Sequence, residues 1–200
     1  MRLVLLFAMS AVLGMSARNN VGLGDAPPTE LTIVLDFEGQ HSEESVAEMK
    51  REAAFIIRPA GFVFDWHLRN EVGHSSYPNL ILVKLRGECL MHASLRSRSH
   101  PVRGPLASSH TTRTTVMRFA DIKCDAVSSL VGPADGVLFG RALGRVLAHE
   151  LWHILGNTFA HCKNGIAQRS LSAEQLISGR LDLDPADLER FRFWRAKWDH

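Results

Sequence analysis

Net charge is almost absent from this chain, since 23 Lys and Arg residues stand against 21 Asp and Glu residues and leave a formal net charge of +2. Such a nearly equal number of positive and negative charges gives no reason to expect a nucleic acid or an anionic membrane as a partner. After its N-terminus the sequence also lacks any run near the roughly 18 consecutive apolar residues of a membrane-spanning helix. No internal repeat is found. With 46% apolar residues, the 200-residue chain is predicted to form one globular domain with its own core.

The longest apolar run lies at the N-terminus. Arg2 precedes the apolar segment from Leu3 to Met15, and small residues follow it. This order is typical of a secretory signal peptide, which we predict to be residues 1–17. Residues 18–29 are rich in Gly, Pro and Asn and are predicted to form a flexible leader. The folded domain is therefore expected over residues 30–200 of a secreted or periplasmic protein.

Cysteine is scarce, with three in the chain: Cys89, Cys124 and Cys162. Export from the cytosol would permit a disulfide. Cys89 and Cys124 each close a predicted strand region, so they are the favoured pair. Cys162 is then left as a free buried thiol, an intermolecular bridge or a substitute metal ligand, and the free thiol is the favoured of these interpretations.

The stretch HELWHILG, residues 149–156, carries the clearest chemistry in the sequence. Histidines four apart on a helix lie one turn apart on the same face, so His149 and His153 can reach one zinc ion at about 2.0–2.1 Å. Glu150 can lean toward the same cavity without being a ligand and accept a proton from a water molecule. This H-E-x-x-H arrangement is the one found in zinc-dependent peptidases.

The chain after the motif offers a third ligand. Gly156 can end the helix in a left-handed turn, which would let the chain double back and present His161. Three protein ligands leave the fourth position open for water, as a catalytic zinc site requires. The competing interpretation is that these histidines are hydrogen-bonded core or surface residues.

The residues before the motif predict a mostly buried helix over positions 136–148, with Asp135 as its N-cap. Arg141 and Arg145 lie one turn apart and are expected on the solvent-facing side of this helix. A His-Glu-His cluster inside an otherwise apolar helix would be costly to bury without a partner such as a metal ion.

The stretch HELWHILG with a later histidine resembles the zincin peptidases, and their metzincin branch in particular. This resemblance covers residues 149–161 and implies a zincin-like fold and a peptide or protein substrate. It also implies that His149, His153 and His161 bind Zn²⁺, with Glu150 as the general base. The protein would then be a zinc metalloendopeptidase.

Two features depart from the metzincin pattern. In metzincins the third histidine lies three residues after the glycine, where this chain has Phe159, and His161 comes two residues later. Metzincins also place a methionine turn beneath the metal, yet no methionine follows Met117. The chain is therefore expected to be metzincin-like, with a variant loop around the third ligand.

The remaining segments predict a single α+β domain with a mixed, twisted sheet, one helix before the motif helix and a short helical C-terminal part. Strands are expected over residues 30–37, 62–68, 79–85 and 114–119, and an amphipathic helix over 43–58. A turn at 121–124 and a short loop should lead into the motif helix. From the resemblance, part of 104–112 is expected to form an edge strand that could pair with an extended peptide. Helix starts are predicted at Ser170 or Ser172 and at Asp184-Pro185.

Three alternative sites remain open. Glu174, 25 residues after His149, could replace His161 as the third ligand of a gluzincin-like site. The segment around Cys89 faintly resembles that of peptide deformylases, in which a cysteine and two histidines bind the metal. The third alternative is a secreted binding module. Its metal site would be structural or vestigial, with Cys162 closing it as a fourth ligand.

The partners of the ligand histidines are also open at this level. Aspartates could orient them by accepting a hydrogen bond from the ring nitrogen that does not face the metal; the available ones are Asp121, Asp125, Asp182 and Asp184. No residue can be assigned to stabilise an oxyanion. The loop histidines His92, His100 and His110 are expected to be solvated rather than bound to metal.

Overall fold

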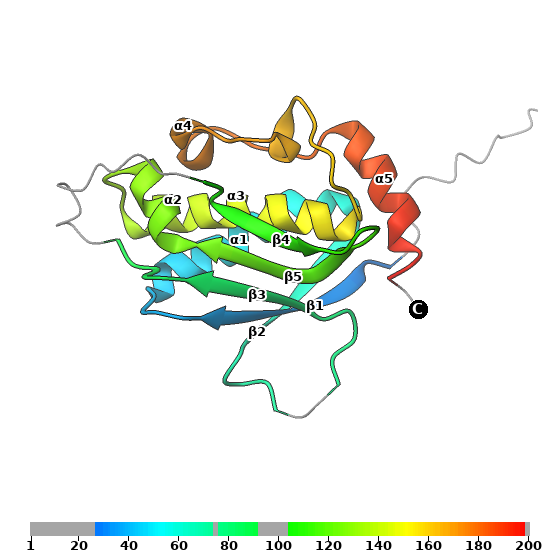
Figure 1. The fold of residues 1–200 in the computed structure, drawn as a ribbon, viewed down its shortest axis with the longest axis horizontal. Coiled ribbons are helices and arrows are strands. Elements are labelled where there is room, and N and C mark those ends of the chain that lie inside the picture. Colours follow the sequence, from blue (N-terminus) through cyan, green and yellow to red (C-terminus); the bar gives the residue numbers. More distant parts are fainter. Residues whose placement is uncertain (1–26, 74–75, 92–103, 199–200) are drawn as a thin grey trace, which may run out of the picture.

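The computed structural model describes residues 27–73, 76–91 and 104–198, in which a five-stranded sheet carries helices on one face (Figure 1). The strand order is β2-β1-β3-β5-β4. Neighbouring strands are parallel except β4, which lies at the edge and runs antiparallel to β5. The strands are β1 (Thr29–Phe37), β2 (Phe62–Leu68), β3 (Ile81–Arg86), β4 (Ala107–Thr111) and β5 (Val116–Lys123). The predicted mixed sheet and the edge strand within 104–112 are confirmed.

The helices cover the sheet and continue past its β4 edge. They are α1 (Glu43–Ile57), α2 (Cys124–Val131), α3 (Gly136–Leu155), α4 (Ala173–Ile177) and α5 (Pro185–Arg195), with short 3₁₀ turns η1 (Arg58–Ala60) and η3 (Gly165–Ala167). In Figure 1, α1 and α3 lie behind the strands, and the chain after α3 runs back beyond β4. The signal peptide predicted at 1–17 and most of the predicted leader lie outside the described residues.

The core forms where apolar side chains of the central strands meet α1 and α3. Leu31, Ile33 and Leu35 of β1 are almost fully buried, and β3 places Ile81 and Val83 in register with two of them. β3 lies between β1 and β5, which confirms the prediction that this apolar run is central in the sheet. Along β3, Ile81, Val83 and Leu85 are buried against the helices, whereas Leu82 and Lys84 between them are only partly buried.

Glycines on three successive turns of α3 bring it close to α1. A Cβ added at Gly140 would lie 2.5 Å from the backbone oxygen of Ser45, and one added at Gly144 would lie 2.8 Å from that of Met49. At Gly136, the backbone oxygen accepts a 3.0 Å hydrogen bond from the Ser45 hydroxyl. No side chain larger than hydrogen fits at this contact, so the glycines set the distance between the two helices.

Arg145 corrects the expectation of a solvent-facing arginine pair on α3. Its side chain is 2% exposed and donates to Glu52 Oε1 on α1 over 2.8 Å. It also donates to the backbone oxygens of Gln175, Ser178 and Gly179 around the end of α4. A buried guanidinium is tolerated because its donors are matched by a carboxylate and three carbonyls. Arg141, partly exposed, donates to the backbone oxygen of Ile177.

The segment after β5 also differs from expectation. β5 continues to Lys123, and residues 124–131 form α2 rather than a turn and loop. Cys124, Val127 and Val131 are buried at helical spacing and pack into the core. Their burial stabilises a helix that is too short to be evident from its sequence alone.

The predicted disulfide is confirmed, since Cys89 and Cys124 are bonded and buried. The C-terminal helix starts as predicted, with Asp184 as N-cap and Pro185 in the first turn. Phe191 within the helix and Trp198 just after it are buried. None of the helices in the described part of the chain combines the length and apolar character that crossing a bilayer requires.

The glycine contact can be tested with Gly140→Ala. Alanine normally favours a helix over glycine by about 1 kcal/mol, whereas overpacking a tight contact costs about 1–3 kcal/mol. Because the clash would be with backbone, we expect the free energy of unfolding in denaturant to fall by a net ~1–2 kcal/mol. Gly73→Ala, where no atom lies within 4 Å of the added Cβ, is the matched control. Equal stability of the two variants would contradict the close packing.

Candidate metal centre

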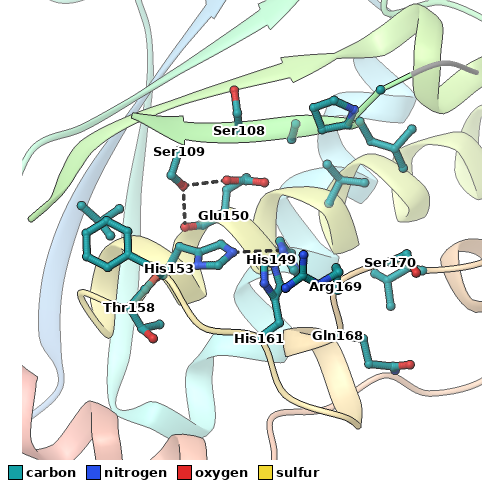
Figure 2. A pocket seen from close by; sticks show the side chains of 18 of the residues that line it. Ser108, Ser109, His149, Glu150, His153, Thr158, His161, Gln168, Arg169 and Ser170 are labelled. Carbon is teal, nitrogen blue, oxygen red and sulfur yellow. Dashed lines mark hydrogen bonds between the residues drawn. The ribbon is translucent and has the colours of Figure 1, made fainter. Parts of the chain in front are cut away.

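His149, Glu150 and His153 lie in the last two turns of α3 (Figure 2). Glu150 is buried, and the two histidines are partly buried. The Nε2 atoms of His149 and His153 are 3.2 Å apart. The predicted one-turn spacing therefore aims both imidazoles at one point.

The turn that follows α3 differs in detail from the prediction. Gly156 has φ −87° and ψ −1°, so it is not left-handed, and Asn157 instead has φ 41°. Asparagine is one of the few residues that adopt this conformation readily. Its side-chain oxygen accepts a 2.7 Å hydrogen bond from the backbone N–H of Val116 at the start of β5. The turn is thus attached to the sheet.

This turn brings His161 to the other two histidines. Its ring centroid lies 5.3 Å from that of His149 and 4.8 Å from that of His153. The three residues each offer a ligand atom, and these atoms all lie within 4.8 Å of one another. The displaced position of His161 in the sequence therefore does not prevent convergence.

Backbone carbonyls orient the two helix histidines. His149 Nδ1 lies 2.8 Å from the backbone oxygen of Ile166, and His153 Nδ1 lies 2.7 Å from that of Thr158. A carbonyl oxygen only accepts, so each Nδ1 carries the proton and each Nε2 of a neutral ring has a free lone pair. Both carbonyls fix the orientation of the rings, and neither could be identified from the sequence, because every residue has a backbone carbonyl.

The four aspartates considered for this task lie elsewhere. Asp121 Oδ1 and Oδ2 bind Arg86 and His110, each over 2.6 Å. Asp125 accepts from the backbone N–H of Glu88. Asp182 accepts from the Arg180 side chain, and Asp184 accepts from the backbone N–H of Ala186. His110 contacts Asp121 and is not part of the group of possible metal ligands found among the described residues. His92 and His100 lie outside the described residues.

The donor set fits zinc. Two nitrogens bound to a tetrahedral zinc ion at about 2.0–2.1 Å would be about 3.3 Å apart, close to the observed 3.2 Å between the Nε2 atoms of His149 and His153. With both Nδ1 atoms protonated, two lone pairs face each other at this distance unless a cation lies between them. Burial lowers the pKa of His153 to about 4 and also lowers that of His149. The rings are therefore kept neutral, as metal ligands must be.

Glu150 contacts the edge strand rather than the histidines. The Ser109 hydroxyl on β4 donates to Glu150 Oε2 over 2.6 Å (Figure 2). Burial raises the pKa of Glu150 to about 7, although the bond from Ser109 opposes the shift. Sequence reasoning missed Ser109, because serine on a polar edge strand carries no signal until its neighbour across the cleft is known.

The three histidines and Glu150 line a pocket of about 550 Å³, within the usual range of ligand sites. One wall is β4 with the residues just before it, and the other is formed by segments 158–161 and 168–171. Its lining is largely apolar and includes Leu106, Leu130, Val146 and Leu171. Arg169 also lines the pocket, and its side chain extends toward His149 and His161 in Figure 2.

The alternative ligands are not part of this group. Glu174 is exposed on α4, and Cys162, a free thiol, lies with its Sγ 3.7 Å from Asp187 Oδ1. Neither residue belongs to the cluster of possible metal ligands found among the described residues. Cys89 is bonded to Cys124 and so cannot offer a thiolate, which makes the deformylase-like interpretation wrong.

Comparisons with known proteins give a fold but no family. No protein-family model matches the chain, and no curated protein matches its sequence. Among solved structures, the chain is similar to archaemetzincin from Methanopyrus kandleri, with a TM-score of 0.55 and 11% identity over 84% of this chain and 97% of the other. At this identity the likeness concerns the fold alone. It confirms the expected zincin-like α+β domain, in agreement with the sheet and helices described above.

The third ligand can be tested by zinc affinity, measured in competition with a chelator. We expect His161→Ala to lower the affinity by more than the roughly 10- to 100-fold that losing an outer-shell partner costs. Glu174→Ala and Cys162→Ala should bind zinc like the wild type, because neither side chain faces the cluster. Wild-type affinity in His161→Ala would remove this residue from the site.

The pKa of Glu150 predicts a pH-dependent stability of the metal-free protein. A carboxyl group whose pKa rises from 4.5 to about 7 on folding stabilises the fold below pH 4.5, and this contribution is lost as the pH rises through 7. The neutral variant Glu150→Gln lacks this loss. Between pH 4 and pH 8, its free energy of unfolding should therefore rise by about 3 kcal/mol relative to that of the wild type. Denaturant unfolding at both pH values measures this, with the exposed Glu174→Gln as control. A difference that does not change with pH would contradict the shift.

Proposed function

We propose that the protein is a secreted zinc-dependent metallopeptidase that hydrolyses peptide bonds. The observation that carries this proposal is the convergence of His149, His153 and His161, each with a ligand atom near one point, in the same pocket as the buried Glu150. The likeness in fold to archaemetzincin supports it. Three protein donors leave an open position, which distinguishes a catalytic from a structural zinc site.

Zinc, when bound by the three imidazoles, would act as a Lewis acid and would lower the pKa of a bound water molecule. Glu150 acts as the general base: it accepts a proton from the attacking water and passes it to the departing amine. In the metal-free protein, burial raises the pKa of Glu150 to about 7, and a more basic carboxylate is a better proton acceptor. Ser109 holds the carboxyl group through its hydroxyl donor and so orients Glu150 toward the pocket.

The edge strand gives this site a way to hold a peptide. β4 pairs with β5 and lies last in the sheet order, so its outer edge is free for an extended chain within the described sheet. A substrate that pairs with β4 would lie next to Glu150 of α3, because Ser109 of β4 contacts Glu150 directly. This arrangement suits endopeptidase cleavage within a longer chain.

Two features support secretion. The N-terminal residues have the order of charge, apolar run and small residues that is typical of a signal peptide. The buried disulfide between Cys89 and Cys124 is of the kind that persists in oxidising compartments.

The proposal is tested by zinc content and cleavage of a mixed peptide library, for the wild type and Glu150→Gln. We expect both to bind one zinc ion, because Glu150 is not a ligand. The variant should cleave about 100- to 10,000-fold more slowly, because it lacks the base. Glu174→Gln, an exposed glutamate on α4, is the control and should cleave like the wild type. A wild type that takes up no zinc, or a Glu150→Gln variant with full activity, would overturn the proposal.

A further inference from the structure

The candidate active-site pocket contains one fixed positive charge that the proposed reaction does not use. Among the described residues that line it, Arg169 is the one arginine or lysine and Glu150 the one acid. With neutral histidines and a bound zinc ion, positive charge in the pocket would exceed negative charge. A ligand that carries a negative charge would complement this surplus.

Within the described part of the chain, the Arg169 side chain makes no hydrogen bond, ion pair or ring contact. Its charge acts on His161, whose pKa is lowered by burial and by this neighbouring arginine. Other arginines around the site are engaged. Arg145 binds Glu52 and three carbonyls, Arg141 binds the backbone oxygen of Ile177, and Arg190 donates to the Thr158 hydroxyl. Hydrogen bonds within the protein thus hold these three arginines in place, whereas no such bond holds the side chain of Arg169.

The backbone that carries Arg169 is nevertheless held in place. Ile166 donates its backbone N–H to Asp182, and Cys162 donates to the oxygen of Ala167. Gln168 donates its side-chain amide to Gly165, and Leu171 packs against the core. An anchored backbone with a free cationic head is suited to binding, since little of the chain must be ordered when a ligand arrives.

Glu150 does not neutralise Arg169. Its carboxyl group accepts from Ser109 on the β4 wall, and Arg169 reaches in from the opposite wall, beside His149 and His161 (Figure 2). The missing negative charge must therefore come from the ligand.

We propose that Arg169 is a carboxylate-binding residue that selects substrates with a carboxylate next to the scissile bond. This proposal rests on the proposed function. The planar guanidinium can hold a carboxylate through two parallel hydrogen bonds, and Arg169 is exposed at the pocket, where a ligand can reach it. The carboxylate has two possible sources, the C-terminus of a peptide or an Asp or Glu side chain, and they present the same chemistry to Arg169.

A binding experiment tests the residue without catalysis. N-acetyl-leucine and N-acetyl-leucinamide differ in carrying a carboxylate or a neutral amide, and both offer an apolar side chain to the pocket. For metal-free protein titrated by NMR, we expect the acid to bind at least about 10-fold more tightly than the amide. Arg169→Gln should abolish this preference and Arg169→Lys should restore part of it. Arg180→Gln, which removes an exposed arginine paired with Asp182, should keep it. No preference in the wild type would overturn the proposal.

Cleavage by the zinc-loaded protein then identifies the source of the carboxylate. One pair of peptides ends just after the scissile bond in a free acid or an amide; another has Asp or Asn there within a longer chain. We expect Arg169→Gln to lower kcat/KM at least about 10-fold for the acidic member of the preferred pair alone. An equal loss for acidic and neutral peptides would overturn the proposal, because Arg169 would then act on the reacting carbonyl. If the wild type cleaves nothing but its metal-free form prefers the acid, the peptidase function fails and the carboxylate site stands.

Discussion

The close contact between α1 and α3 is the constraint on which the site depends. Gly140 and Gly144 let the backbone of α3 approach that of α1 more closely than any side chain would permit. A helix fixed in this way along one face has its rotation about its own axis fixed as well. The opposite face, which carries His149 and His153, is therefore directed to the β4 edge of the sheet.

The site is completed by segments that reach α3 from both sides. On one side β4 brings Ser109 to Glu150, and on the other the loop after the helix returns His161 and the carbonyl of Thr158. Arg145 ties the same helix to the end of α4 through three carbonyls. Glu150, the three histidines and the pocket walls thus share one support, as the proposed base and metal ligands would need to keep a productive geometry.

Much of the framework could be predicted from local patterns. The strands, the long motif helix and its Asp135 cap follow from apolar periodicity and capping chemistry, and the structure confirms them. The pairing of Cys89 with Cys124 was also predicted correctly. Short elements are less visible: the turn and short loop expected before the motif helix leave out α2, because eight residues stabilised by burial carry little signal of their own.

The sequence by itself determined which residues on α3 share a face, because helical periodicity places positions 149 and 153 one turn apart in any fold. Tertiary structure decided everything that depends on a second segment. It assigned the carbonyls of Ile166 and Thr158 to the histidines, Ser109 to Glu150 and a buried role to Arg145. These contacts join positions that are distant in sequence, and a backbone carbonyl or a lone serine has no pattern that reveals its partner. Only the packing of sheet, helix and returning loop brings them together.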